Sequence, residues 1–170
     1  PGTQGREFHS LPFDDTNTRL NKYLHKMGTP PPEVGLTAWQ ARSAERVIEE
    51  IAQGKRTIMA ELCARFGKTI WGGVLTRETN ANLTVVVSYV LTSFASFEKE
   101  FVGFKQFADF VTIDTSDSDY QERINQALTE NKQVVAFLSM CVGGRRQQKI
   151  DYLFGLDTNR LVLIDEADFG

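Results

Sequence analysis

The chain contains few of the residues from which metal sites and disulfide frameworks are built. Among its 170 residues there are two cysteines, Cys63 and Cys141, and two histidines, and all four stand far apart in the sequence. A structural zinc site needs four clustered ligands, so the composition excludes one. Both cysteines stand in apolar sequence, and we expect reduced thiols packed in the core, a reading we favour over a redox-sensitive Cys63.

Long hydrophobic runs and an excess of positive charge are absent as well. No apolar run approaches the roughly 20 residues that a membrane-spanning helix needs, and the first ten residues show no signal-peptide pattern. With 19 basic against 22 acidic residues the net charge is −3, which excludes a nucleic-acid module recognisable by composition. We expect a cytoplasmic protein of a prokaryote or a virus-infected cell, without a membrane partner.

The first 35 residues differ from the rest of the chain. They are polar, include three consecutive prolines at 30–32 and leave room for one short helix over 17–26. Because proline restricts its neighbours to extended conformations, residues 1–35 are predicted to be an extension or a linker. Residues 36–170 are predicted to form the domain.

From residue 36 onwards, helical and strand-like patterns alternate. The expected strands are 56–62, 83–90, 107–115, 133–140 and 160–165, and the expected helices are 38–54, the part of 63–79 that follows a bend, 92–104, 117–131 and 145–156. The strand segments are apolar throughout, which is typical of a parallel sheet buried on both faces. The pattern predicts an α/β fold with three layers and a mainly parallel sheet.

A phosphate-binding motif follows the first expected strand. Gly67, Lys68 and Thr69 match the end of the pattern G-x-x-x-x-G-K-[ST], in which backbone N–H groups and the lysine bind phosphates and the hydroxyl binds Mg²⁺. The match is incomplete, because Leu62 stands at the first glycine position and Arg65 and Phe66 precede Gly67. The alternative is a helix N-terminus that carries a lysine by chance.

A pair of carboxylates follows the last expected strand. Asp165 and Glu166 come directly after an apolar run, where a charge is costly unless a cation meets it. The loop with Lys68 and Thr69 is expected to follow a strand of the same sheet. We therefore predict that Asp165 holds Mg²⁺ together with Thr69, and that Glu166 orients or deprotonates the attacking water. The alternative is a strand that ends in an acidic surface loop.

Taken in order, these segments resemble the first motor domain of superfamily 2 helicases and translocases. The resemblance covers residues 36–170. Within that superfamily, the segments are most similar to the DEAD/DEAH-like motors of restriction enzymes and of viral or prokaryotic helicases. The resemblance implies a P-loop (RecA-like) domain that is incomplete, because it stops after the second motif. It implies that Trp39 and Gln40 recognise adenine and that Arg65 belongs to the nucleotide loop. It implies nucleic-acid contacts near Ser88, Tyr89 and Ser139, although Ser88 and Tyr89 replace a commoner proline-containing segment.

The resemblance also implies an activity and partners. The parent protein would hydrolyse ATP with Mg²⁺ to move on or unwind nucleic acid, DNA in preference to RNA. It would also contain a second RecA-like domain, which this fragment lacks. We therefore expect this fragment alone to have little ATPase activity. Two alternatives remain: a P-loop protein that uses nucleotide as a switch without motor activity, and a degenerate domain whose loop is only structural.

Two weaker signals concern a basic loop and an aromatic stripe. The segment 143–149 is rich in glycine and basic residues, so Arg145 and Arg146 are candidates for phosphate-backbone contacts, against the simpler reading of a solvated helix start. Four phenylalanines recur at helical spacing, which favours a core position over base stacking. These are Phe94, Phe97, Phe101 and Phe104.

Overall fold

The domain contains a four-stranded parallel sheet. A computed structural model describes residues 33–63, 66–89, 93–140 and 146–165. Its strands are β1 (Leu83–Ser88), β2 (Val111–Asp114), β3 (Val134–Ser139) and β4 (Arg160–Ile164), in the spatial order β2-β3-β1-β4. All three pairs of neighbouring strands run parallel.

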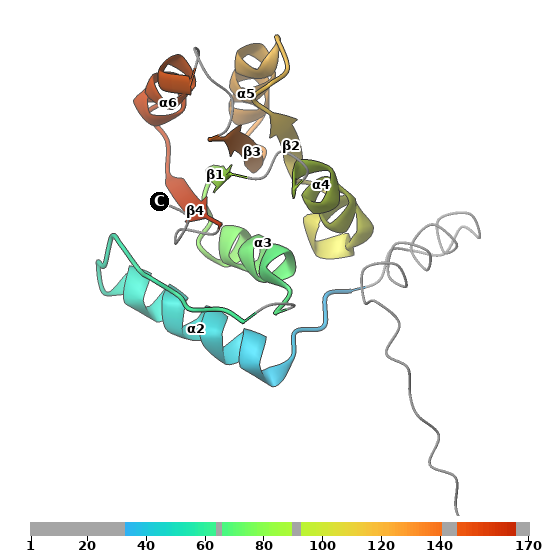
Figure 1. Cartoon of the computed structure of the whole chain (residues 1–170), viewed down its shortest axis with the longest axis vertical. Helices are drawn as coiled ribbons and strands as arrows, with labels where there is room; N and C mark the ends of the chain where they lie inside the picture. Colours follow the sequence, from blue (N-terminus) through green and yellow to red (C-terminus); the bar gives the residue numbers. More distant parts are fainter. Residues whose placement is uncertain (1–32, 64–65, 90–92, 141–145, 166–170) are drawn as a thin grey trace, which may run out of the picture.

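Helices cover both faces of this sheet (Figure 1). They are α2 (Ala38–Ala52), α3 (Lys68–Glu78), α4 (Ser93–Gly103), α5 (Tyr120–Thr129) and α6 (Arg146–Gly155), with a short 3-10 helix η1 (Lys105–Phe107) after α4. The hydrophobic clusters place α3 and α4 on one face of the sheet and α5 and α6 on the other, and α2 packs against α3. The predicted three-layer α/β class is confirmed.

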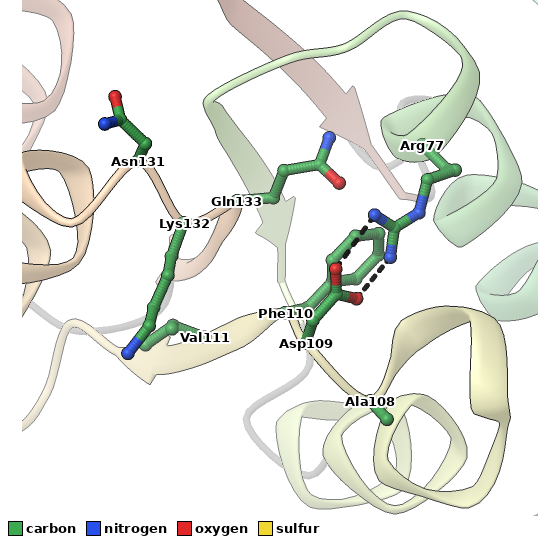
Figure 2. A pocket seen from close by; sticks show the side chains of 8 residues that line it. All are labelled: Arg77, Ala108, Asp109, Phe110, Val111, Asn131, Lys132 and Gln133. Carbon is green, nitrogen blue, oxygen red and sulfur yellow. Dashed lines mark hydrogen bonds and ion pairs between the residues drawn. The ribbon is translucent and has the colours of Figure 1, made fainter.

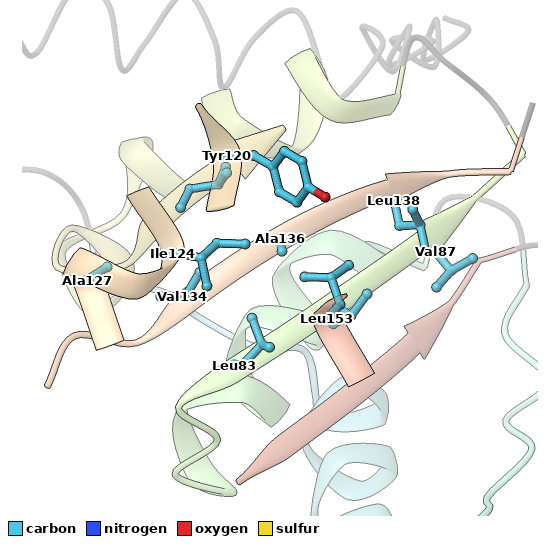
Figure 3. Packing of buried hydrophobic residues seen from close by; sticks show 11 residues of the cluster. Leu83, Val87, Tyr120, Ile124, Ala127, Val134, Ala136, Leu138 and Leu153 are labelled. Atoms are coloured by element: carbon cyan, nitrogen blue, oxygen red, sulfur yellow. The ribbon is translucent and has the colours of Figure 1, made fainter. Parts of the chain in front are cut away.

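The face that carries α5 and α6 is an aliphatic core (Figure 3). Alternate residues of β1 and β3 point toward these helices, as the two-residue period of a strand requires. Ile124 of α5 and Leu153 of α6 are fully buried against them. Burying a side chain of this size contributes about 1.5–3 kcal/mol, so this layer is a main source of stability.

The opposite face carries an aromatic core. Phe97 and Phe101 of α4 pack against Phe137 of β3 and against further rings from the η1 region, and Phe94 lies 4.4 Å from Phe137, ring centroid to ring centroid. Phe104 is also buried, although it follows α4 rather than belonging to it. The prediction that the phenylalanine stripe belongs to the core is confirmed.

The ends of α2 follow from local sequence. Thr37 caps the helix, its hydroxyl accepting from the backbone N–H of Gln40 while the Gln40 side chain accepts from the Thr37 N–H, which is a capping box. At the other end Gly54 adopts the left-handed conformation, with φ +88°. A threonine N-cap and a left-handed glycine just beyond the last turn are both signals that the local sequence carries.

Two expectations are wrong. Residues 56–62, expected as the first strand, contain no strand, and Met59 is 93% exposed. A short apolar run shows that a segment can be a strand, but a strand exists only where a partner is available to pair with it. Cys63, expected in the core, is exposed, because it follows this unpaired segment.

Other expectations fall partly or wholly outside the described residues. The helix over 17–26 and Cys141 lie there. The end of the N-terminal segment is described, and it contacts the domain: the backbone N–H of Val34 donates to Gln106 Oε1 at 2.9 Å, and Lys105 Nζ lies 3.5 Å from Glu33 Oε1. Across the ranges that the structure covers, no helix is both long and apolar enough to cross a membrane.

Candidate functional site

The carboxyl ends of three strands meet at one edge of the sheet. Ser88 of β1 pairs in register with Ser139 of β3, and Asp165 follows β4 directly, its N–H donating to the Val87 carbonyl at 2.9 Å. Ligands of open α/β sheets bind at this edge. The structure therefore brings together three positions that are up to 77 residues apart in the sequence, 88 and 165 being the extremes.

The turn before α3 ends at the same edge. Gly67 is left-handed (φ +80°, ψ +44°) and caps α3, and its carbonyl accepts from the N–H of Trp71 at 3.0 Å. Lys68 is the first residue of the helix, and Lys68 Nζ lies 3.3 Å from Asp165 Oδ1. The glycine-lysine-threonine turn and the carboxylate after β4 are thus neighbours, although 97 residues separate them.

The charges of this pair are open to solvent and to a ligand. Both side chains are partly exposed, and a pair of this kind contributes little to stability. The N-terminus of α3 adds the positive end of a helix dipole and N–H groups without helical partners. The arrangement can bind an anion at Lys68 and the start of α3, with a carboxylate beside it that can accept a cation.

Gln40 lies behind the turn and holds its backbone. Its Nε2 donates to the Phe66 carbonyl at 2.5 Å, and its Oε1 accepts from the N–H of Thr37 at 2.8 Å. A Cβ placed on Gly67 would come within 2.7 Å of the same Nε2. Gln40 is only 9% exposed. The side chain that was predicted to recognise adenine is therefore also a brace between α2 and the turn.

This bracing role was missed in the sequence, although a signal for it existed. The spacing Thr37-x-x-Gln40 is that of a capping box, which orients the glutamine side chain toward the start of its own helix. An amide has two N–H donors and two acceptor lone pairs. One of each is used by the bonds to Phe66 and Thr37, and one of each remains.

Trp39 lies on the open side of the start of α2. It is 75% exposed, and the guanidinium carbon of Arg42 lies 6.0 Å from the centre of its ring system. An exposed indole beside a guanidinium is a suitable surface for stacking a nucleobase. Arg42 was not among the predicted site residues.

The candidate nucleic-acid residues divide into two groups. Ser88 is buried, while Tyr89 and Ser139 are partly buried at the ends of their strands. Arg146 begins α6 with an exposed side chain, and its Nη1 donates to the Met140 carbonyl at 3.4 Å. The remaining predicted positions lie outside the described residues: Arg65, Arg145 and Glu166.

The two predicted magnesium ligands lie at the start of α3 and directly after β4. Thr69 lies in the first turn of α3, half-buried, and Asp165 already faces a cation, the Lys68 ammonium. Among the described residues, no group of three or more His, Cys, Asp or Glu side chains could hold a metal by itself. Mg²⁺ bound by one or two protein ligands together with phosphates and water needs no such group.

A hollow of about 440 Å³ lies at the opposite end of the sheet (Figure 2). It is lined by residues at the amino ends of β2 and β3 and by Arg77 at the end of α3. The Arg77 guanidinium donates hydrogen bonds to the Asp109 carboxylate and to the Gln106 carbonyl. It also lies on the face of Phe110, whose ring centre is 4.4 Å from the guanidinium carbon. The hollow is therefore a structural junction rather than the candidate site.

Comparisons with protein-family models, with curated proteins and with solved structures each found no match.

Proposed function

We propose that this chain is the ATP-binding lobe of an ATP-dependent helicase or translocase that acts on DNA. One observation carries the proposal: Lys68, at the start of a helix that follows a left-handed glycine, lies 3.3 Å from Asp165 at the end of a neighbouring parallel strand. A phosphate chain with its metal needs a cation and a carboxylate of this kind side by side.

Each residue has a proposed part in binding. Lys68 and the N–H groups at the start of α3 bind the β- and γ-phosphates. Thr69 and Asp165 hold Mg²⁺, which neutralises the charge that develops on the phosphates. Trp39 stacks on the base, and the free N–H and lone pair of Gln40 read its edge. Glu166 activates water, as the resemblance to superfamily 2 motors implies.

The first test of this proposal measures nucleotide binding, before any measurement of ATP hydrolysis. We expect a fluorescent ATP analogue with Mg²⁺ to bind the chain, and Lys68→Ala to abolish most of that binding. Lys132→Ala is the matched control, because this exposed lysine pairs with Glu130 instead and its loss should leave binding unchanged. Equal binding by Lys68→Ala and the unchanged chain contradicts the proposal.

Base preference and nucleic-acid binding distinguish the motor from a simple nucleotide switch. In the motor reading, Trp39→Ala lowers affinity for ATP and narrows the preference for ATP over GTP. A labelled single-stranded DNA should bind in a salt-dependent manner, more weakly after Arg146→Ala. Nucleotide binding without any DNA binding favours the switch.

The Lys68–Asp165 contact also favours a second candidate, a structural domain in which the two charges only neutralise each other. In that case Lys68→Met together with Asp165→Leu leaves stability nearly unchanged, and no nucleotide raises the melting temperature of the unchanged chain. Stabilisation by Mg-ATP, which follows from binding to the folded state, refutes this candidate.

A further inference from the structure

The short segment before α2 is held at both ends. Residues 33–37, the connecting segment, contain neither helix nor strand and lead into α2 (Figure 1). Near its start, the Val34 N–H donates to Gln106 Oε1 at 2.9 Å, and Val34 packs against the aromatic core. At its end, the Thr37 N–H donates to Gln40 Oε1 at 2.8 Å. Because three residues of chain span at most about 11 Å, the two contacts are closely linked through the backbone.

Gln106, which accepts the first of these bonds, is fixed to α3 and to the aromatic core. It is the middle residue of η1, and its backbone carbonyl accepts a hydrogen bond from Arg77 in the last turn of α3. The next residue, Phe107, is 3% exposed among the rings of the core. Neither contact involves the connecting segment. Gln106 therefore offers Val34 an acceptor whose position is set by α3 and the core.

Gln40, at the other end, is fixed to the turn before α3. Its Nε2 donates to the Phe66 carbonyl at 2.5 Å, and a Cβ on Gly67 would lie 2.7 Å from the same atom. These two residues come directly before Lys68 and set the direction in which the chain enters α3. A change in the position of Thr37 therefore reaches the turn through the Gln40 side chain.

Together these contacts form a closed ring. It runs from the turn through the start of α2 and the connecting segment to η1, and it returns through Arg77 to the last turn of α3. Between its two ends α3 is closely packed, because a Cβ on Gly73 would lie 2.8–2.9 Å from the rings of Phe107 and Phe101. A contiguous series of hydrogen bonds and packed elements is a route along which two distant positions can be energetically coupled.

We propose that Gln106 and the connecting segment position the phosphate-binding turn, so that release of Val34 from Gln106 lowers the affinity for nucleotide. The inference rests on the proposed function, because it concerns regulation of the same site. A turn that is already held in place loses less conformational freedom when phosphates bind to it. One uncharged hydrogen bond is worth a factor of about two to ten in an equilibrium constant, and this sets the largest effect that its loss can have.

Substitution of Gln106 tests the effect on nucleotide affinity. Gln106→Ala removes the acceptor for the Val34 N–H and keeps the backbone carbonyl that Arg77 contacts. We expect a fluorescent ATP analogue with Mg²⁺ to bind this variant about two- to fivefold more weakly. Gln106→Glu keeps an acceptor at the same side-chain length and should bind like the unchanged chain. Gln126→Ala is the matched control, because this exposed glutamine of α5 bonds Glu130 instead.

Lengthening the connecting segment separates positioning from local packing. Three flexible residues inserted after Gly35 leave both end contacts possible and remove the short connection between them. The insertion alone should lower nucleotide affinity as much as Gln106→Ala does, and in its background Gln106→Ala should have no further effect. A merely local role of Gln106 in packing η1 predicts the same loss of affinity in both backgrounds, and that result overturns the proposal. Equal affinity of Gln106→Ala and the unchanged chain overturns it too.

Two amides report on the turn without any nucleotide. The Phe66 N–H donates to the Cys63 carbonyl at 3.2 Å, and the Trp71 N–H donates to the Gly67 carbonyl at 3.0 Å. Amide hydrogen exchange measures how often such bonds open. Both amides should therefore exchange faster when the turn is no longer positioned.

Hydrogen exchange keeps this test apart from the test of the proposed function. Gln106→Ala and the insertion should each speed exchange at the two turn amides several-fold relative to Gln126→Ala, while the amides of β1 keep their protection. Unchanged exchange at the turn refutes the positioning. If the unchanged chain binds no nucleotide, the proposed function fails, and exchange still decides whether Gln106 positions the turn. Circular dichroism shows whether each variant folds. If Gln106→Ala does not fold, the insertion variant, which keeps every side chain, decides by the same measurements.

Discussion

Replacing Gly67 by alanine should destabilise the domain for two separable reasons. The first is conformational, because φ is +80° at this position and a left-handed backbone costs an alanine about 1–2 kcal/mol. The second is steric, because the new Cβ would lie 2.7 Å from Gln40 Nε2. Gln40 must then move and lose its bond to the Phe66 carbonyl, at about 1 kcal/mol. The sum is about 2–3 kcal/mol.

Two other glycines supply controls that separate these causes. Gly54 has a similar φ of +88°, but an added Cβ would meet nothing within 4 Å, so Gly54→Ala measures the conformational cost alone. Gly155, at the end of α6, has neither problem, and Gly155→Ala should be neutral or slightly stabilising. The order of destabilisation should therefore be Gly67, then Gly54, then Gly155.

Urea unfolding followed by circular dichroism measures these differences as shifts in the midpoint. With a slope of about 1–3 kcal/mol per M, Gly67→Ala should lower the midpoint by roughly 1 M or more. In a Gln40→Ala background, the steric part disappears and Gly67→Ala should cost no more than Gly54→Ala. An equal cost of Gly67→Ala in both backgrounds would refute the idea that Gln40 braces the turn.

Three further predictions concern packing and charge. Gly73→Ala places a Cβ 2.8 Å from a phenylalanine ring of the aromatic core and should cost about 1–3 kcal/mol by overpacking, measured by thermal unfolding. Ile124→Ala empties a fully buried position and should cost about 2–5 kcal/mol in urea unfolding; a cost below 1 kcal/mol contradicts the assigned core. The hydrogen bond from Arg77 lowers the pKa of Asp109. Because the pair is largely exposed, it stabilises the fold by less than about 1 kcal/mol. This contribution is fully present at pH values above the ordinary aspartate pKa, and it is lost as the pH falls through the lowered pKa. The difference in melting temperature between Asp109→Asn and the unchanged chain should be present at neutral pH and shrink as the pH falls below the ordinary aspartate pKa of about 3.9; a difference that does not change with pH refutes this account.

Much of the fold could be predicted from local patterns. Four of the five expected strands are present, because runs such as 83–88 and 134–139 are mostly apolar and can be buried on both faces only inside a parallel sheet. The ends of α2 were predictable for a similar reason, since Thr37 and Gly54 act through their own backbone neighbourhood. The proximity of Lys68 and Asp165 was expected from two parallel strands that end at one edge, but no strand precedes Lys68 in the described residues. The two side chains meet because the start of α3 lies at the carboxyl end of β4.

The pairing of segments was decided by the tertiary structure. Residues 56–62 have the composition of a strand, but composition does not supply a partner, and among the described residues β4 pairs with β1 alone. Cys63 is exposed for the same reason. The brace from Gln40 to the Phe66 carbonyl joins segments 26 residues apart, so it depends on how α2 packs against α3. Sequence by itself determined the helices α2 to α6, four of the five expected strands and the end of the sheet that carries the polar residues, because these depend on local periodicity and chain direction. Tertiary structure alone decided strand order, the open edge of β4 and the Gln40 contact, because these depend on which surfaces meet.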